Sequence, residues 1–112
     1  MREILDKAND LGLLIRETDI YRRFRDITEE LENEPGIKGK LDNYYRSAED
    51  LKKREDLGDI IEKYEIEEFE EMSSAIAENE LIVRYLSAKN EYIKLLTDIQ
   101  KSVREDDFTG DE

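Results

Sequence analysis

Acidic side chains at helical spacing are the groups in this sequence that come nearest to a catalytic or metal-binding set. Glu67 and Glu71, Glu68 and Glu71, and Asp26 and Glu30 are three or four residues apart, so each pair lies on one side of a helix. Helical bundles that hold two iron ions combine inward glutamates with Glu-x-x-His pairs. The sequence contains no histidine, so that ligand set cannot be completed. A solvated acidic face is the better interpretation.

The sequence also lacks the residues that nucleophilic or acid–base catalysis would need. With no cysteine and no histidine there is no thiolate nucleophile and no imidazole base, and no serine, threonine or lysine has neighbours that would activate it. The stretch DDFTGDE gathers oxygen atoms, but it lacks the alternating ligands and the twelfth-position glutamate of a calcium loop. We therefore expect no enzymatic activity, no metal and no cofactor, and we interpret residues 105–112 as a disordered acidic tail.

The most basic stretch is Arg22, Arg23 and Arg25, with Tyr21 and Phe24 beside them. A stretch that combines basic and aromatic side chains can contact nucleic acid. Here acidic residues four positions away neutralise the cluster on its own helix, and the net charge of −13 opposes an approach to phosphate backbones or anionic lipid. A charged rim beside a protein interface fits better, because arginine and tyrosine are favoured there.

Apolar residues recur at intervals of three and four along most of the chain, which predicts four or five amphipathic helices. The first spans residues 2–17, and Thr18 or Asp19 offers the N-cap of the next. Pro35 begins a third, because its missing N–H would have no partner in a first turn. Gly58 marks either a turn between two helices or a kink in one long helix, and the periodic pattern resumes from Asp59.

The last predicted helix, capped by Asn79, carries more apolar surface than one contact needs. We expect one of its seams to pack within the chain and the other against a second subunit. The first seam is Leu81, Tyr85, Ala88, Tyr92, Leu95 and Ile99, and the second is Ile82, Leu86, Ile93, Leu96 and Val103.

The amino-acid composition limits the size of the hydrophobic core. Leu, Ile, Val and Phe make 29 of the 112 residues, enough for folding but little for covering several helices. The sequence predicts a single all-α domain over residues 1–104, built as an elongated helical hairpin or bundle that dimerises through helix packing. The start MREILDKAND has no signal-peptide pattern and no run approaches the length of a membrane span, so we expect a cytoplasmic protein.

Three stretches together carry a family resemblance. They are REILDKANDLGLLIRETDIYRRF, the proline-initiated helix after LENEP, and ENELIVRYLSAKNEYIKLLTDI. In their order and spacing the chain resembles the YlbF/YmcA/YheA family of small bacterial helical proteins. The resemblance implies an all-α fold, dimers and a regulatory role; in some Gram-positive bacteria such proteins affect competence, sporulation and biofilm formation and are linked to an endoribonuclease that processes messenger RNA. Family complexes that hold iron–sulfur clusters do so through cysteines, which this chain lacks, so it is more similar to the cysteine-free YheA-like members.

From these observations we expect a non-enzymatic adaptor or regulator that acts on RNA processing or developmental regulation through a protein partner. The partners would be a second copy, paralogous subunits or an RNA-processing nuclease, with no direct binding of nucleic acid or membrane. The alternative is a structural or chaperone-like bundle without a dedicated partner. The residues expected to anchor the protein interface are Tyr21, Arg23, Phe24, Arg84, Tyr85 and Tyr92.

Overall fold

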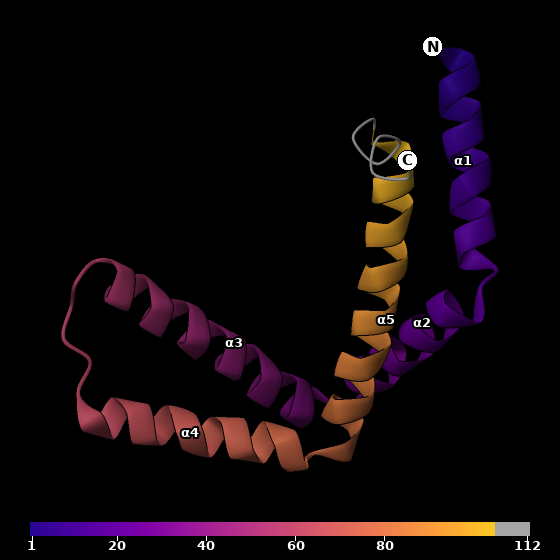
Figure 1. Ribbon diagram of the computed structural model, residues 1–112. Coiled ribbons are helices and arrows are strands. Elements are labelled where there is room, and N and C mark those ends of the chain that lie inside the picture. The colour runs from indigo at the N-terminus through magenta and orange to yellow at the C-terminus, as the bar shows by residue number, and fades with distance from the viewer. Residues whose placement is uncertain (105–112) are drawn as a thin grey trace. The chain divides into compact units, whose positions relative to one another are not determined.

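The protein is all-helical over residues 1–104, the part of the chain that the computed structural model describes. Those residues form five α-helices and no strand, which confirms the predicted fold class (Figure 1). The predicted acidic tail, residues 105–112, lies outside the described part. The helices are α1 (Arg2–Arg16), α2 (Asp19–Glu32), α3 (Pro35–Asp56), α4 (Lys63–Glu78) and α5 (Glu80–Val103).

Local side-chain signals set most helix boundaries. The hydroxyl oxygen of Thr18 accepts a hydrogen bond from the Tyr21 amide at 3.1 Å, so Thr18 is the residue that caps α2. The side chain of Asn79 accepts one from the Ile82 amide at 3.0 Å and caps α5 in the same way. Pro35 is the first residue of α3, as predicted. Each cap satisfies an amide that the helix itself leaves unpaired.

Gly58 forms a turn between α3 and α4, which decides between the two possibilities that the sequence left open. Its φ of +81° is the only positive φ among the described residues. The Asp59 amide donates to the Arg54 carbonyl at 2.9 Å and the Gly58 amide donates to the Glu55 carbonyl at 3.0 Å. This pair of bonds is the Schellman ending of a helix, in which the left-handed residue is usually glycine.

The start of α4 differs from the prediction. The apolar pattern placed a helix from Asp59, with Ile60 and Ile61 on its stripe, whereas α4 begins at Lys63. The Schellman turn uses the residues up to Asp59, and the Glu62 amide donates to Glu65 Oε2 at 2.9 Å. This is the return bond of a capping box, so the helix starts directly after Glu62.

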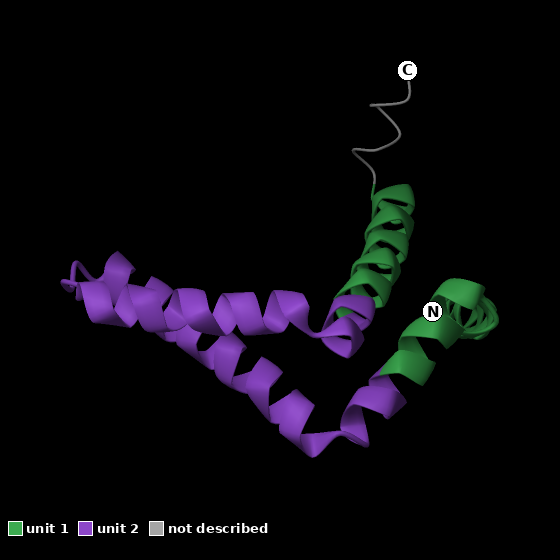
Figure 2. Ribbon diagram, turned by 90° about the horizontal axis from the view of Figure 1, so that it is seen from below, with its two compact units in different colours: residues 1–27, 86–112 green, residues 28–85 purple. Residues whose placement is uncertain are grey.

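Packing divides the chain into two compact units (Figure 2). Unit 2 spans Thr28–Tyr85 and contains the antiparallel pair α3 and α4, which lie side by side and are joined by the Gly58 turn. Its buried side chains come from four helices and leave 7% or less of their surface exposed: Leu31, Leu41, Ile76 and Ile82. The prediction of one domain over residues 1–104 stays a prediction.

Among the described residues, unit 1 consists of Met1–Ile27 and residues 86–104. Ile27 and Ala88 are its buried hydrophobic residues among those described, and α1 contributes none. A small core of this kind leaves most of the apolar surface of α1 unused.

We predict that Gly58→Ala lowers the free energy of unfolding by about 1 kcal/mol, because a Cβ disfavours the left-handed backbone that the turn requires. No atom lies within 4 Å of the added Cβ, so the effect comes from the backbone alone. Urea unfolding followed by circular dichroism measures it.

Gly39→Ala is the matched control for that variant, since it lies inside α3 and its added Cβ also meets nothing within 4 Å. It should stabilise the protein by about 0.5–1 kcal/mol through helix propensity. Equal effects of the two substitutions would contradict the role given to the turn.

Candidate protein-interaction surfaces

An aromatic cluster joins α2 to α5 within unit 1. The ring of Tyr92 stacks on Phe24 with 5.1 Å between centroids and meets Tyr21 edge-on at 5.8 Å. All three side chains are half-buried. Aromatic pairs in these geometries each contribute about 0.5–1.5 kcal/mol beyond burial of their area. Three of the six predicted anchor residues therefore hold two helices of the chain together.

Arg23 lies beside this cluster and forms an ion pair with Glu91 at 3.0 Å. The sequence suggested instead that Asp19 neutralises Arg23 on its own helix, and that pairing does not occur among the described contacts. Both partners are about half exposed, at 44% and 50%, so solvent screens their attraction and the pair contributes little to stability. The pair links α2 to α5 at the edge of the cluster.

The remaining predicted anchors lie at the start of α5, in unit 2. Arg84 forms an ion pair with Glu30 at 3.3 Å, and both side chains are about half exposed. Tyr85 is half-buried beside it. The structure thus brings Tyr21, Arg23, Phe24 and Tyr92 together and places Arg84 and Tyr85 in the other unit. The role of these six residues at an interface with another protein stays a prediction.

The apolar face of α1 is left uncovered in unit 1. Ile4 is 68% exposed, Leu11 38% and Leu14 61%, and no residue of α1 is buried. Periodicity predicted this face, but it did not reveal that the rest of the chain leaves it open to solvent. Contiguous exposed apolar surface of this kind marks an interaction site more often than a structural accident.

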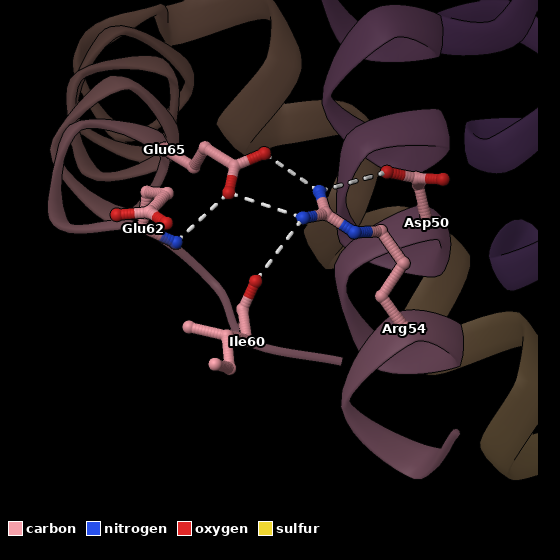
Figure 3. Close-up of polar contacts among 5 residues, drawn as sticks. All are labelled: Asp50, Arg54, Ile60, Glu62 and Glu65. Atoms are coloured by element: carbon pink, nitrogen blue, oxygen red, sulfur yellow. Dashed lines mark hydrogen bonds and ion pairs between the residues drawn. The ribbon is translucent and has the colours of Figure 1, made fainter. Parts of the chain in front are cut away.

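The α3–α4 turn is held by one arginine that contacts several groups (Figure 3). Arg54 Nη1 and Nη2 donate to the two carboxylate oxygens of Glu65, at 2.6 and 3.1 Å, and Nη2 also donates to the Ile60 carbonyl at 3.5 Å. Asp50 lies 3.8 Å from the same guanidinium. A bidentate arginine–carboxylate pair fixes both distance and plane, so it restrains the turn more firmly than a single ion pair would.

This clamp lowers the pKa of the Glu65 carboxyl below its ordinary value of 4.5, chiefly through the hydrogen bond from Arg54 and then through the Glu62 amide. The same bond raises the pKa of Arg54. Because the folded protein favours the ionised form of Glu65, the contact stabilises the fold at neutral pH. That contribution is lost as the pH falls through the lowered pKa.

The turn also presents side chains that sequence reasoning placed elsewhere. Leu57 is 73% exposed and Ile60 is 82% exposed, although the apolar pattern assigned Ile60 to the stripe of a helix. The sequence did contain a signal for this turn. Gly58 can end one helix as its C-cap glycine, and Glu62 with Glu65 three residues later can begin the next helix. Arg54 gave no signal, since its partners are set by how the two helices pack.

The described residues offer little for other kinds of site. No group of three or more acidic residues within residues 1–104 could hold a metal ion. A hollow of about 140 Å³ beside the clamp is lined by Arg54, Glu65 and Phe69 among others, and two of its charged groups, Arg54 and Glu65, already pair with each other. None of the five helices is long and apolar enough to cross a membrane.

The fold and these surfaces define a small all-helical protein whose exposed features suit contact with other proteins. The chain belongs to the family described as control of competence regulator ComK, YlbF/YmcA, whose model matches residues 4–106. The match confirms the family resemblance that the sequence predicted, and the family is described as regulatory.

Relatives match over nearly the whole chain. A UPF0342 protein of Caldicellulosiruptor bescii is 23% identical over 103 residues, which is 92% of this chain and 87% of the relative. A UPF0342 protein of Bacillus licheniformis is 24% identical over 98 residues, covering 88% and 84%. One of Shouchella clausii is 23% identical over 105 residues, covering 94% and 89%.

We predict that Arg54→Met raises the pKa of Glu65 toward 4.5, because it removes the largest cause of the lowering. A pH titration of the side-chain carboxyl carbon by NMR measures the change. Lys94→Met is the matched control, since Lys94 lowers the pKa of Asp98 in the same manner. That control should raise the pKa of Asp98 and leave Glu65 as it was; an unchanged Glu65 in Arg54→Met would refute the clamp.

Proposed function

We propose that this protein is a non-enzymatic regulator that works by binding other proteins, first a second copy of itself and then a dedicated partner. The partner would be a paralogous subunit or an RNA-processing nuclease, and the process would be RNA processing or developmental regulation in the cytoplasm. The family description, control of the competence regulator ComK, supports regulation as the role. The observation that carries the proposal is the uncovered apolar face of α1.

An isolated helix as short as α1 is unstable in water. It has 15 residues, and helices shorter than about 12–15 residues are marginal even with favourable sequences. Most helical stability in proteins comes from packing of the apolar face. With none of its residues buried, α1 needs a cover that its own chain does not supply. Another protein surface is the natural source of that cover.

A second copy offers suitable cover in the later part of the second seam of α5, since Ile82 at the start of that seam is buried within the chain. Ile93 is 47% exposed and Val103 is 75% exposed, so this seam is also incompletely covered.

We predict that Ile4→Ser combined with Leu11→Ser weakens self-association at least about tenfold, since exposed aliphatic anchors supply most of the affinity of such helix faces. Light scattering and sedimentation equilibrium over a range of concentrations measure it. The variant should remain folded because neither residue is buried in the chain.

Leu13→Ser is the matched control: Leu13 is 55% exposed, is also in α1, and points to the side away from the apolar face. It should leave self-association unchanged. A wild-type protein that is monomeric at all concentrations would remove self-association from the proposal, and equal weakening by both variants would remove this face.

For the dedicated partner, the anchors are the aromatic and arginine residues of α2 and α5. We predict that Arg84→Glu combined with Tyr85→Ala abolishes the partner complex while circular dichroism shows the helical content retained. The physical reason is that arginine and tyrosine supply directional and apolar contact in one place. Isothermal titration with the purified partner provides the measurement.

A charge swap separates a contact with the partner from a contact within the chain. Arg84→Glu with Glu30→Arg restores an ion pair between α5 and α2. If Arg84 touches the partner, binding stays lost in the swap; if it only orients the helices, binding returns. Recovery would take Arg84 out of the proposed interface.

A chaperone-like bundle is the competing function, and the exposed face of α1 favours it too. The two differ in stoichiometry. Purification of the tagged protein from its own host, with mass spectrometry and light scattering, should yield one complex of fixed composition that contains a paralogous subunit or an RNA-processing nuclease. Rescue of many unrelated aggregating proteins with no fixed complex would favour the chaperone and overturn the adaptor.

A further inference from the structure

A groove follows one face of the α3–α4 pair, within unit 2. It consists of two open hollows of about 450 and 520 Å³ and the smaller hollow beside the Arg54 clamp, and Met72 of α4 lines all three. Met72 is half-buried, and Ala75, which lines the first of these hollows, is exposed. The middle of this α3–α4 groove is therefore apolar and open to solvent.

The charged residues that line the groove separate by helix. At the turn, Asp50 and Glu65 both pair with Arg54 (Figure 3). The other charged lining residues are exposed and have no ion-pair partner within residues 1–104: Lys40 and Arg46 on α3, and Glu68 and Glu71 on α4. The α3 edge of the groove thus has unpaired basic groups, and the α4 edge has unpaired acidic groups.

An occupant that satisfies both edges must be acidic where it meets α3 and basic where it meets α4. A second copy of the chain, turned by 180°, has this arrangement without any further requirement. Its acidic α4 edge then meets the basic α3 edge, and its basic α3 edge meets the acidic α4 edge. Such an interface uses the same surface on both copies and makes each contact twice.

Charge also selects how the two grooves face each other. A two-fold axis parallel to the helices sets α3 of one copy against α4 of the other, whereas an axis across them sets α4 against α4. Because α4 has six acidic side chains and one basic one, the second arrangement brings two strongly acidic helices together. In α3, six basic side chains accompany five acidic ones. The first arrangement also makes the facing helices antiparallel, as in up-down four-helix bundles.

We propose that the α3–α4 groove is a self-association surface, at which two copies pack into a four-helix bundle. Met72 and Ala75 of each copy would supply the apolar contact. Lys40 and Arg46 of one copy would pair with the glutamates on the α4 edge of the other. The apolar contact supplies affinity, and the charged edges fix the register and orientation of the two copies.

Other occupants satisfy only one edge of the groove. A basic helix would suit α4 but would bring like charge to Lys40 and Arg46, and an acidic helix would do the reverse. Anionic lipid and nucleic acid would bring like charge to the glutamates of α4. The groove uses neither α1 nor the aromatic cluster, so this contact is independent of the one proposed for α1. Together the two contacts would join copies into assemblies larger than dimers.

The test reverses one edge of the groove at a time, in the full chain with the α1 double substitution described above, so that the α1 contact is absent. One variant is Lys40→Glu with Arg46→Glu, and the other is Glu68→Lys with Glu71→Lys. Each alone should weaken self-association at least about tenfold, because both edges of its groove then have the same sign. Sedimentation equilibrium measures the association.

An equimolar mixture of the two variants gives the specific signature of this contact. The acidic edges of one variant match the basic edges of the other, so the mixture should form a heterodimer with about the affinity of the unreversed chain. Each reversal changes a net charge of −13 by four units, so both variants stay negatively charged. Attraction between net charges therefore cannot cause the recovery.

Two measurements control for a general effect of charge and for loss of folding. Lys52→Glu with Lys53→Glu makes the same change of charge on α3, but these lysines line a separate hollow, and association should stay as it was. Methyl NMR of the unreversed chain needs no edge variant. Met72 and Met1 are its two methionines, and only the Met72 signal should shift with protein concentration.

Three results would overturn the proposal. The unreversed chain could stay monomeric at every concentration, with a fixed Met72 signal. The mixture could fail to recover association while circular dichroism shows both variants helical. Or the Lys52 and Lys53 control could weaken association as much as the edge variants do, which would indicate a general effect of charge. None of these results would bear on the α1 contact, which is measured by its own variants.

Discussion

The supply of apolar side chains limits this structure more than any single contact does. Five helices each present an apolar stripe, yet the buried hydrophobic residues among those described number six. They are shared between two units, and none lies in α1. As a consequence, the amphipathic helix α1 keeps its apolar face uncovered in the folded chain. Burial of apolar area is the main driving force of folding and association alike, so the surface left over is available for binding.

Where apolar packing is thin, polar contacts determine local geometry. Unit 2 folds back at Gly58, and there a single arginine contacts a carboxylate, a backbone carbonyl and a second acid. Unit 1 uses a different solution, in which Tyr92 packs against Phe24 and Tyr21 and an exposed ion pair lies beside the rings. In both cases groups distant in sequence orient helices with little buried surface. The exposed ion pairs among these contacts specify an arrangement without adding much stability.

The regulatory description of the family agrees with this distribution of features. A regulator that works by contact needs ordered surfaces and has no need of an enclosed, reactive pocket. This chain offers an apolar helix face, an aromatic cluster with Arg23 beside it, and a turn held by Arg54 that exposes Leu57 and Ile60. Different surfaces can serve different partners at the same time.

The amino-acid sequence by itself determined the helices and most of their ends. Pro35 and Asn79 act on backbone groups within a few residues, so their effects can be inferred without knowledge of the fold. Thr18 and Gly58 act equally locally, but the sequence left open whether Thr18 or Asp19 caps α2 and whether Gly58 forms a turn or a kink, and the structure decided both. It also determined the all-α class and the family, through periodicity and the order of patterned segments. The tertiary structure alone decided which stripes are covered: α1 is left open, Ile60 is exposed instead of helical, and Arg23 pairs with Glu91 across 68 positions. Periodicity tells which side of a helix is apolar, but whether that side is buried depends on the length, position and shape of every other helix, and no local pattern encodes those.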